Sequence, residues 1–162
     1  MDKSNRRMVR ALRKEYPHPV GIVLDVGGYD VSGNVAAILE DEVYSVDLVM
    51  QDGLSIVADA HCLPVKCNSC AAVWSTSTLQ YVDNPFLMVS EIRRVLMPGG
   101  IAYLEAPTSE TPGLVGRHWR NQVQDSFRFY PKGMRSMLMY ARFDKILHVG
   151  GPSDRVWGVA EK

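Results

Sequence analysis

The chain has no surplus of charge of either sign and no long apolar run. Its 18 basic residues equal its 18 acidic residues, so no overall field draws the protein to nucleic acid or to an anionic membrane. No stretch reaches the roughly 18 apolar residues that a membrane span needs, and the charged start, MDKSNRR, leads into no signal-peptide core. We therefore expect no membrane partner, and nucleic acid is a disfavoured one.

Cysteine is also scarce. Cys62, Cys67 and Cys70 are an odd number within one short stretch, which is a poor framework for disulfides and predicts a reducing, cytoplasmic location. Together with His61 they could supply four ligands to zinc, and Cys67 with Cys70 could form a redox dithiol. Because Pro64 fixes the loop and Cys70 leads into an apolar strand, we expect ordinary loop and core cysteines and no metal.

The length of 162 residues and the 46% share of hydrophobic residues suit one hydrophobic core. We therefore expect a single domain over residues 1–162. Its predicted parts are a basic N-terminal helix (1–19), a ligand-binding core (20–106), a connection that covers the site (107–130), and a closing helix with strands (131–162).

Hydrophobic periodicity and turn residues predict the elements along the chain. The helix over 4–16 carries a surplus of basic residues, which we interpret as a solvated face in preference to an arm for RNA or an acidic substrate. A second helix starts at Asp83 or Asn84 with Pro85 in its first position. Its predicted buried face is Phe86, Val89, Ile92 and Leu96. The other expected helical segments are 35–39 and 131–140, and the expected strands are 20–26, 43–47, 54–58, 71–74, 101–106, 143–149 and 156–160.

Strands that alternate with helices predict an α/β fold: a Rossmann-like, doubly wound sheet with helices on both faces. The sheet should be mostly parallel. The last two strands are joined too closely for a crossover, so they should add an antiparallel strand near the C-terminus. In such sheets, ligands bind beyond the carboxyl ends of the strands, where the strand order reverses.

Distinctive residues follow four of the predicted strands. They are Asp25 with Gly27-Gly28, then Asp47, then Asp59-Ala60, and then the run from Ser75 to Thr78. Glycines let a ligand approach the backbone, and a strand-end carboxylate can accept hydrogen bonds from both hydroxyls of a ribose. The set predicts a nucleoside site. A nicotinamide-dependent oxidoreductase is an alternative, although the chain lacks a full G-x-G-x-x-G and has no room for a catalytic domain.

Four segments in order carry a resemblance to a known family: VLDVG, YSVD, ADAHCLP and SEIRRVLMPGG, between Val23 and Pro107. The sequence resembles the class I S-adenosylmethionine-dependent methyltransferases, especially the type 11 methyltransferase domain. The segment FRFYPKG (127–133) is also similar to one found before the last helix of some members. The resemblance implies transfer of a methyl group from S-adenosylmethionine to an acceptor.

By that resemblance, Asp25 and Gly27 line the methionine part of the donor, Asp47 holds the ribose, and Asp59 contacts the adenine. The full set of predicted donor-binding residues is Asp25, Gly27, Gly28, Asp30, Asp47, Leu48, Asp59, Ala60, Ser75 and Leu79. Tyr29 and Val31 stand where the family usually has its second and third glycines, and Gly27, Asp30 and Gly33 match a variant of the loop. An inactive, methyltransferase-like binding subunit is therefore a second alternative, and donor binding would distinguish it.

The long connection over 107–130 should cover the donor site and form the acceptor pocket. We expect His118 or Asp125 to accept a proton if the acceptor carries one, and Trp119, Arg128 and Tyr130 to bind the acceptor, with Arg128 recognising an anion. The alternative is that the aromatic residues are packing anchors and the charges are solvated. The acceptor is unidentified, its size is open, and a partner subunit could complete the pocket.

Overall fold

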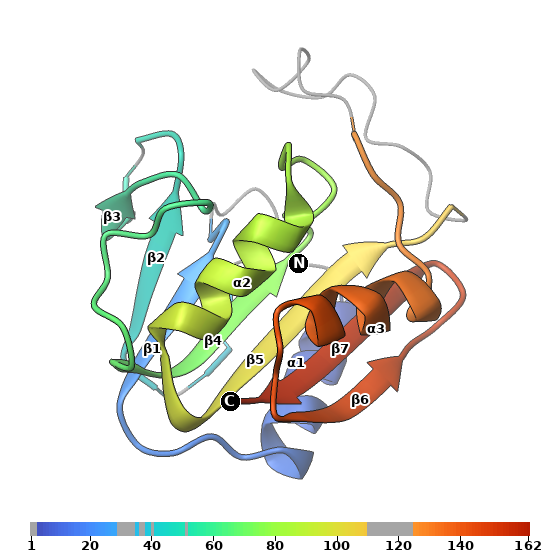
Figure 1. Cartoon of the computed structure of the whole chain (residues 1–162), viewed down its shortest axis with the longest axis horizontal. Helices are drawn as coiled ribbons and strands as arrows, with labels where there is room; N and C mark the ends of the chain where they lie inside the picture. The colour runs from blue at the N-terminus through green and yellow to red at the C-terminus, as the bar shows by residue number, and fades with distance from the viewer. Residues whose placement is uncertain (1–2, 29–34, 36–37, 40, 51, 110–124) are drawn as a thin grey trace.

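The computed structural model describes residues 3–28, 35, 38–39, 41–50, 52–109 and 125–162 (Figure 1). Seven strands form one sheet in the order β3-β2-β1-β4-β5-β7-β6. The strands are β1 (Ile22–Val26), β2 (Val43–Asp47), β3 (Ile56–Val57), β4 (Cys70–Thr76), β5 (Leu96–Pro107), β6 (Lys145–Gly150) and β7 (Arg155–Glu161). The described helices are α1 (Lys3–Glu15), α2 (Pro85–Val95) and α3 (Pro131–Tyr140).

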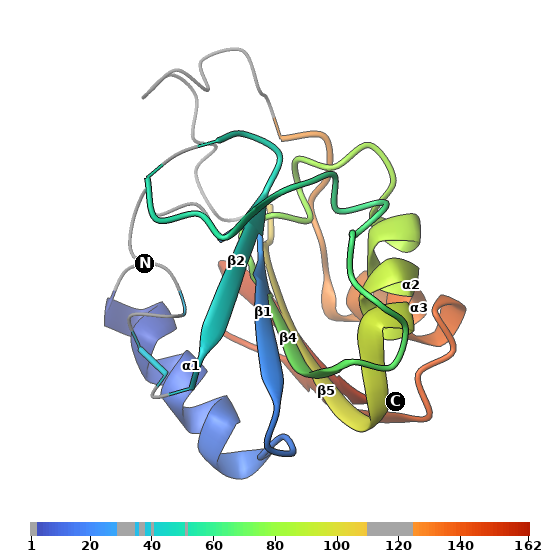
Figure 2. The ribbon, with the colours of Figure 1, turned by 90° about the vertical axis from the view of Figure 1, so that its left-hand side faces the viewer.

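The sheet is doubly wound. Strands β1 to β5 are parallel, and β7 runs antiparallel to both β5 and β6. From β1 the chain moves outward to β2 and β3 and then returns to β4 on the other side of β1. Figure 2 shows α1 on one face of the sheet and α2 with α3 on the other. The predicted Rossmann-like fold is confirmed, and its strand order reverses between β1 and β4.

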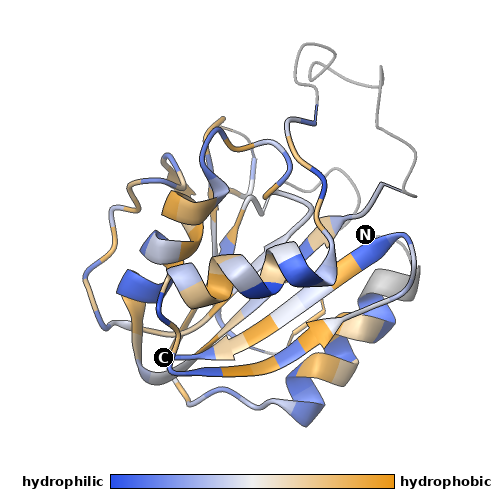
Figure 3. Ribbon diagram, turned by 45° about the vertical axis from the view of Figure 1, so that its right-hand side comes forward, coloured by the Kyte–Doolittle hydropathy of each residue, from blue (hydrophilic) through white to orange (hydrophobic). Residues whose placement is uncertain are grey.

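Each face of the sheet buries its own apolar layer, because side chains along a strand alternate between the two faces. Beneath α2 and α3, Leu24, Val73 and Leu104 pack with helix residues such as Ile92 and Leu138. Beneath α1, Val9 and Leu12 pack against a layer that includes Trp74, Tyr103 and Trp157. In Figure 3, hydrophobic residues run through the strands, and each helix carries both hydrophobic and hydrophilic residues.

Helix α1 is attached to the sheet by specific bonds as well as by its apolar face. The Tyr103 hydroxyl donates to the Tyr16 carbonyl, and the Arg13 guanidinium lies 3.3 Å from the Asp41 carboxylate. The outward side chains Arg7, Arg10 and Lys14 are exposed. The basic segment is therefore a helix laid over the sheet. None of the described helices is long and apolar enough to cross a membrane.

Helix α2 begins as predicted, but its buried face differs. The Asn84 side chain caps the helix by accepting a hydrogen bond of 3.0 Å from the Leu87 amide, and Pro85 takes the first position. The predicted burial of Phe86 is wrong, since this side chain is 40% exposed and its ring meets Tyr140 of α3 edge-on at 5.2 Å. The residues that α2 does bury are Pro85, Met88, Val89, Ile92 and Val95.

One other predicted strand is shorter in the structure, and one predicted helical segment is described only in part. The strand expected over 54–58 is reduced to the two residues of β3. Of the helical stretch expected over 35–39, Val35, Ile38 and Leu39 are described, and the amides of Ile38 and Leu39 donate to the Val35 carbonyl. Strand β5 is longer than expected, because it starts directly after α2 at Leu96.

Asp25 is a carboxyl group inside the core, at the end of β1. It is 1% exposed, and its Oδ2 accepts a hydrogen bond of 3.1 Å from the Val35 amide. Its Oδ1 has no partner among the described residues. Burial raises the pKa of Asp25 to about 7, against the opposing effect of the Val35 amide. The chain after β1 is therefore tied to a carboxyl group that titrates near neutrality.

We predict that Asp25→Asn removes a pH dependence from the stability. Because the pKa is raised in the folded state, the folded protein holds a proton that the unfolded chain releases. The free energy of unfolding of the unsubstituted protein should thus fall, by at most about 4 kcal/mol, as the pH rises from about 4 to 7. Urea unfolding between pH 5 and 8 should show Asp25→Asn gaining on the unsubstituted protein as the pH rises. Parallel profiles would contradict this, and Asp144→Asn, at an exposed carboxylate, is the control.

Candidate functional site

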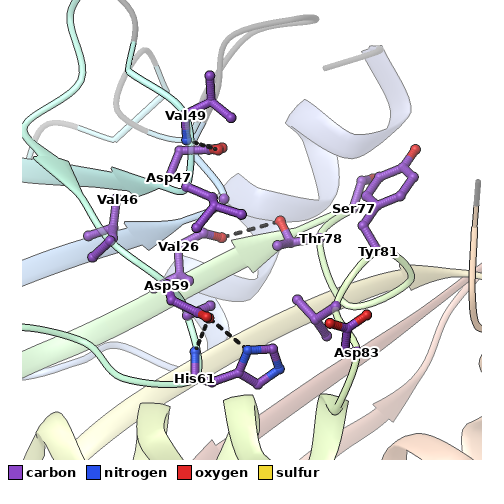
Figure 4. A pocket seen from close by; sticks show the side chains of 15 residues that line it. Val26, Val46, Asp47, Val49, Asp59, His61, Ser77, Thr78, Tyr81 and Asp83 are labelled. Carbon is purple, nitrogen blue, oxygen red and sulfur yellow. Dashed lines mark hydrogen bonds and ion pairs between the residues drawn. The ribbon is translucent and has the colours of Figure 1, made fainter. Parts of the chain in front are cut away.

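A cavity of about 230 Å³ lies beyond the carboxyl ends of β1, β2, β3 and β4, at the point where the strand order reverses (Figure 4). This is the edge of the sheet at which the sequence predicts a ligand. Its lining residues come from four loops: Val26, Gly27, Val46, Asp47, Leu48, Val49, Ala58, Asp59, Ala60, His61, Ser77, Thr78, Tyr81, Val82 and Asp83.

Gly27 forms the wall of the cavity at the end of β1. Its φ of +78° is in the left-handed region, and a Cβ on it would lie 1.9 Å from the Oγ1 of Thr78. That hydroxyl in turn donates to the Val26 carbonyl at 3.3 Å, and the Gly27 amide donates to the Val46 carbonyl at 2.7 Å. Both the backbone angle and the contact with Thr78 therefore require glycine at this position.

Two carboxylates stand on the β2 and β3 side of the cavity. Asp47 Oδ1 accepts a hydrogen bond of 3.3 Å from the Val49 amide. Asp59 Oδ1 lies 2.8 Å from the His61 amide and 2.7 Å from its Nδ1. The hydrogen bond from the His61 amide lowers the pKa of Asp59. Both carboxylates are thus oriented by their own loops, as Figure 4 shows.

His61 joins the loop after β3 to the start of α2. The Asn84 amide lies 3.2 Å from His61 Nε2, and since an amide can only donate, this nitrogen accepts. The neutral ring then carries its proton on Nδ1 and donates it to Asp59. From the sequence, His61 is assigned a role only as a candidate zinc ligand. In the structure it lines the cavity and positions the Asp59 carboxylate.

The loop after β4 supplies the opposite wall, which the sequence missed apart from the Ser75–Thr78 run. Ser77, Thr78, Tyr81, Val82 and Asp83 all line the cavity, and Figure 4 shows Tyr81 and Asp83 across from Asp47 and Asp59. No spacing rule marks Tyr81 or Asp83, because they follow a turn of irregular backbone. Among the described residues that line the cavity there are three aspartates, one histidine and no lysine or arginine.

Of the predicted donor-binding residues, half line this cavity: Gly27, Asp47, Leu48, Asp59 and Ala60. Asp25, Gly28, Ser75 and Leu79 are buried and are not among the lining residues. Gly28 packs against β2, since a Cβ on it would lie 3.0 Å from that of Ser45. Asp30, like Tyr29 before it, lies outside the described residues.

The predicted acceptor residues are only partly described, because His118 and Trp119 fall outside the described ranges. Arg128 forms an ion pair with Asp125 and donates to the Thr108 carbonyl at 3.0 Å. The Tyr130 hydroxyl is hydrogen-bonded to Ser109. None of these described residues lines the cavity. They lie along the end of β5.

The three cysteines take no part in the cavity. Cys62 and Cys67 are exposed, and Arg94 donates to the Cys67 Sγ at 3.1 Å. Cys70 is buried at the start of β4, where burial raises the pKa of its thiol. In the part of the chain that the structure describes, no group of three or more His, Cys, Asp or Glu residues could hold a metal ion.

Comparison with solved structures relates the fold to known methyltransferases. A Thermotoga maritima S-adenosylmethionine-dependent methyltransferase is 18% identical with a TM-score of 0.74, over 98% of this chain and 88% of its own. Burkholderia thailandensis 1,6-didemethyltoxoflavin-N1-methyltransferase, solved with S-adenosylhomocysteine, is 19% identical with a TM-score of 0.71, over 99% and 79%. A chain from the complex of the Haloferax volcanii Trm112 methyltransferase activator with a methyltransferase is 18% identical with a TM-score of 0.61, over 98% and 95%.

At these identities the likeness shows the fold alone. No curated protein sequence is similar enough to count as a match. The family model described as "Methyltransferase domain" matches residues 6–104, which include most of α1 and the strands β1 to β4 that surround the cavity. Because this match covers more than half of the chain, the chain belongs to the methyltransferase domain family, and the predicted S-adenosylmethionine-dependent methyltransferase is confirmed.

Proposed function

We propose that the cavity at the ends of β1 to β4 is where the chain holds S-adenosylmethionine. The observation that carries this proposal is the charge of the lining: Asp47, Asp59 and Asp83, with no lysine or arginine among the described residues around them. S-adenosylmethionine carries a positive sulfur, which such a lining attracts. A nicotinamide dinucleotide carries a pyrophosphate, which the same lining repels. The charge therefore supports the methyl donor over the dinucleotide.

The residues present also fit the donor in shape and hydrogen bonding. Gly27 lets Thr78 pack against the end of β1 and so shapes the cavity wall, and Asp47 ends β2, as a ribose-binding carboxylate does. Asp59 uses Oδ1 for His61, which leaves Oδ2 for a ligand N–H. Leu48 offers an apolar contact.

Methyl transfer requires this chain mainly to orient the two reactants. When bound, the donor supplies a methyl group that its sulfonium sulfur already activates. Holding the two reactants in line can lower a barrier by as much as about 7 to 11 kcal/mol. Gly27, Asp47 and Asp59 would fix one reactant, and the chain after β5 would fix the other. The protein needs a base only where the acceptor atom carries a proton at neutral pH.

We propose that residues 107–130 form the acceptor pocket within a single domain. His118 or Asp125 would accept a proton, and Trp119, Arg128 and Tyr130 would bind the acceptor. The ion pair between Arg128 and Asp125 supports this role, because it orients the guanidinium beside the end of β5. An acceptor with an anionic group would compete with Asp125 for Arg128.

A partner subunit that completes this pocket is a further part of the proposal. It is supported by the similar chain that was solved in complex with the Trm112 activator. The cytoplasmic location stays a prediction from the cysteine content. The acceptor itself is to be found by screening methyl transfer against fractions of a cell lysate.

The donor site is tested by calorimetric titration with S-adenosylmethionine and S-adenosylhomocysteine. We expect both to bind the unsubstituted protein and Asp47→Asn to weaken them about tenfold or more, because hydrogen bonds to a charged group are lost. Asp52→Asn, at an exposed carboxylate in the loop that follows β2, should bind as the unsubstituted protein does. No heat at millimolar ligand would refute the proposal and favour an inactive binding subunit.

The glycine wall is tested by comparing Gly27→Ala with Gly53→Ala. Both glycines have a positive φ, but a Cβ meets Thr78 only at Gly27, and nothing lies within 4 Å at Gly53. Both variants should lose about 1 kcal/mol of stability from the backbone angle, and Gly27→Ala should lose more and bind S-adenosylhomocysteine at least about tenfold more weakly. Chemical denaturation measures the stability of the two variants, and calorimetric titration measures their affinity. Equal affinities of the two variants would count against a ligand beside Gly27.

The acceptor pocket is tested with His118→Ala and Arg128→Ala, using labelled methyl transfer to the active lysate fraction. Loss of a proton acceptor should slow turnover by about 10²-fold or more, and loss of Arg128 should raise the acceptor KM. The affinity for S-adenosylhomocysteine should stay unchanged in both. Lys132→Ala, at an exposed position in α3, is the control. Normal turnover in both variants would mean that these side chains are only solvated or packed.

A further inference from the structure

Ser77 is held in an unusual conformation at the wall of the cavity. Its φ is +54°, in the left-handed region that non-glycine residues rarely adopt and that persists only where the surroundings enforce it. Its amide donates to the Glu105 carbonyl at 3.2 Å, and its hydroxyl donates to Glu105 Oε2 at 2.8 Å. Its carbonyl accepts a hydrogen bond of 2.9 Å from Gln80 Nε2. Every polar group of Ser77 is therefore engaged.

Glu105 is the group that supplies most of this restraint. It lies in β5, fully buried, and its Oε1 accepts a hydrogen bond of 3.0 Å from Arg155 of β7. Burial raises the pKa of Glu105, while Arg155 and Ser77 favour its charged form. A buried ion pair adds little stability over apolar residues of the same volume. The ion pair with Arg155 instead holds the Glu105 carboxylate so that its Oε2 faces Ser77.

Gln80 carries the same network toward the predicted acceptor segment. It is 2% exposed, and while its side chain holds Ser77, its backbone carbonyl accepts from the amides of Ser126 and Phe127 at 2.7 and 3.3 Å. These amides belong to the chain between residue 125 and α3, which contains Arg128 and Tyr130. One continuous set of hydrogen bonds thus runs from the cavity wall to this segment.

We infer that Glu105 and Gln80 are positioning residues: through Ser77 they fix the wall of the donor cavity and couple the occupancy of that cavity to the placement of residues 125–128. The inference rests on the proposed donor site. Neither residue is among those that line the cavity. Their effect is carried by Ser77, which is part of the lining.

The test compares Glu105→Gln with Glu161→Gln, which makes the same chemical change in the ion pair with Lys145 at the opposite edge of the sheet. Calorimetric titration with S-adenosylhomocysteine should show the Kd of Glu105→Gln raised about tenfold and that of Glu161→Gln unchanged. Hydrogen exchange of the Ser126 and Phe127 amides should slow on ligand binding in the unsubstituted protein. In Glu105→Gln, at saturating ligand, this slowing should be lost.

The outcomes separate this inference from the proposed donor site. If the unsubstituted protein does not bind S-adenosylhomocysteine, both are overturned. If it binds, and Glu105→Gln binds equally well with the same slowing of exchange, only the inference is overturned, even if the variant unfolds at a lower temperature. Should Glu105→Gln not fold, Gln80→Met takes its place, because it removes only the bond to Ser77. An unchanged Kd and unchanged exchange in Gln80→Met would then refute the coupling.

Discussion

The parallel pairing of β1 with β4 is the constraint on which the cavity depends. The two strands are neighbours in the sheet but not in the sequence, and Leu24 pairs with Val73 and Asp25 with Trp74. This register brings the end of β1 level with the loop that leaves β4, where the Thr78 hydroxyl reaches the Val26 carbonyl. The chain after β1 turns toward β2 and the chain after β4 turns toward α2, so a hollow forms between them. Glycine at position 27 then leaves room for the Thr78 side chain against the end of β1.

The acidic residues at the strand ends divide into two kinds by burial. Asp25 and Glu105 are buried on β1 and β5, on either side of β4, and each binds a group in a neighbouring loop. Asp47 and Asp59 follow the outer strands, are partly or largely exposed, and face the cavity. The first kind is hydrogen-bonded to a neighbouring loop, and the second kind presents charge to the cavity. Acidic residues at strand ends, which look alike in the sequence, therefore fall into two groups in the fold according to their burial.

The fold could be predicted from the sequence because each of its signals is local. Pro85 after Asn84 marks the start of α2, and the continuous apolar run up to Asp25 marks a strand buried on both faces. The failure at Phe86 has a tertiary cause: Tyr140 on α3 lets an aromatic ring rest at the surface. Strand β3 is short because only Ile56 and Val57 pair with β2, and pairing depends on the neighbour as much as on the segment.

The site was predictable where a residue ends a strand and was missed where it lies in a loop. Gly27, Asp47 and Asp59 follow directly from the strand pattern. Tyr81 and Asp83 follow an irregular turn, and the unusual backbone of Ser77 in that turn depends on hydrogen bonds to Glu105 and Gln80. Neither the turn nor these bonds produce a periodic pattern in the sequence. Sequence periodicity reports which face of an element is buried. It carries no information about a turn whose angles are imposed from another strand.

The reversed direction of β7 has a practical consequence. Arg155 pairs with Pro107 at the carboxyl end of β5, on the side of the cavity, whereas Glu161 pairs with Ile101 toward the amino end of that strand. Figure 1 shows the C-terminus at this second side of the sheet. A purification tag, a fluorophore or a surface-immobilisation linker joined after Lys162 would thus lie far from the cavity, so attachment at this end suits biosensor and crosslinking measurements.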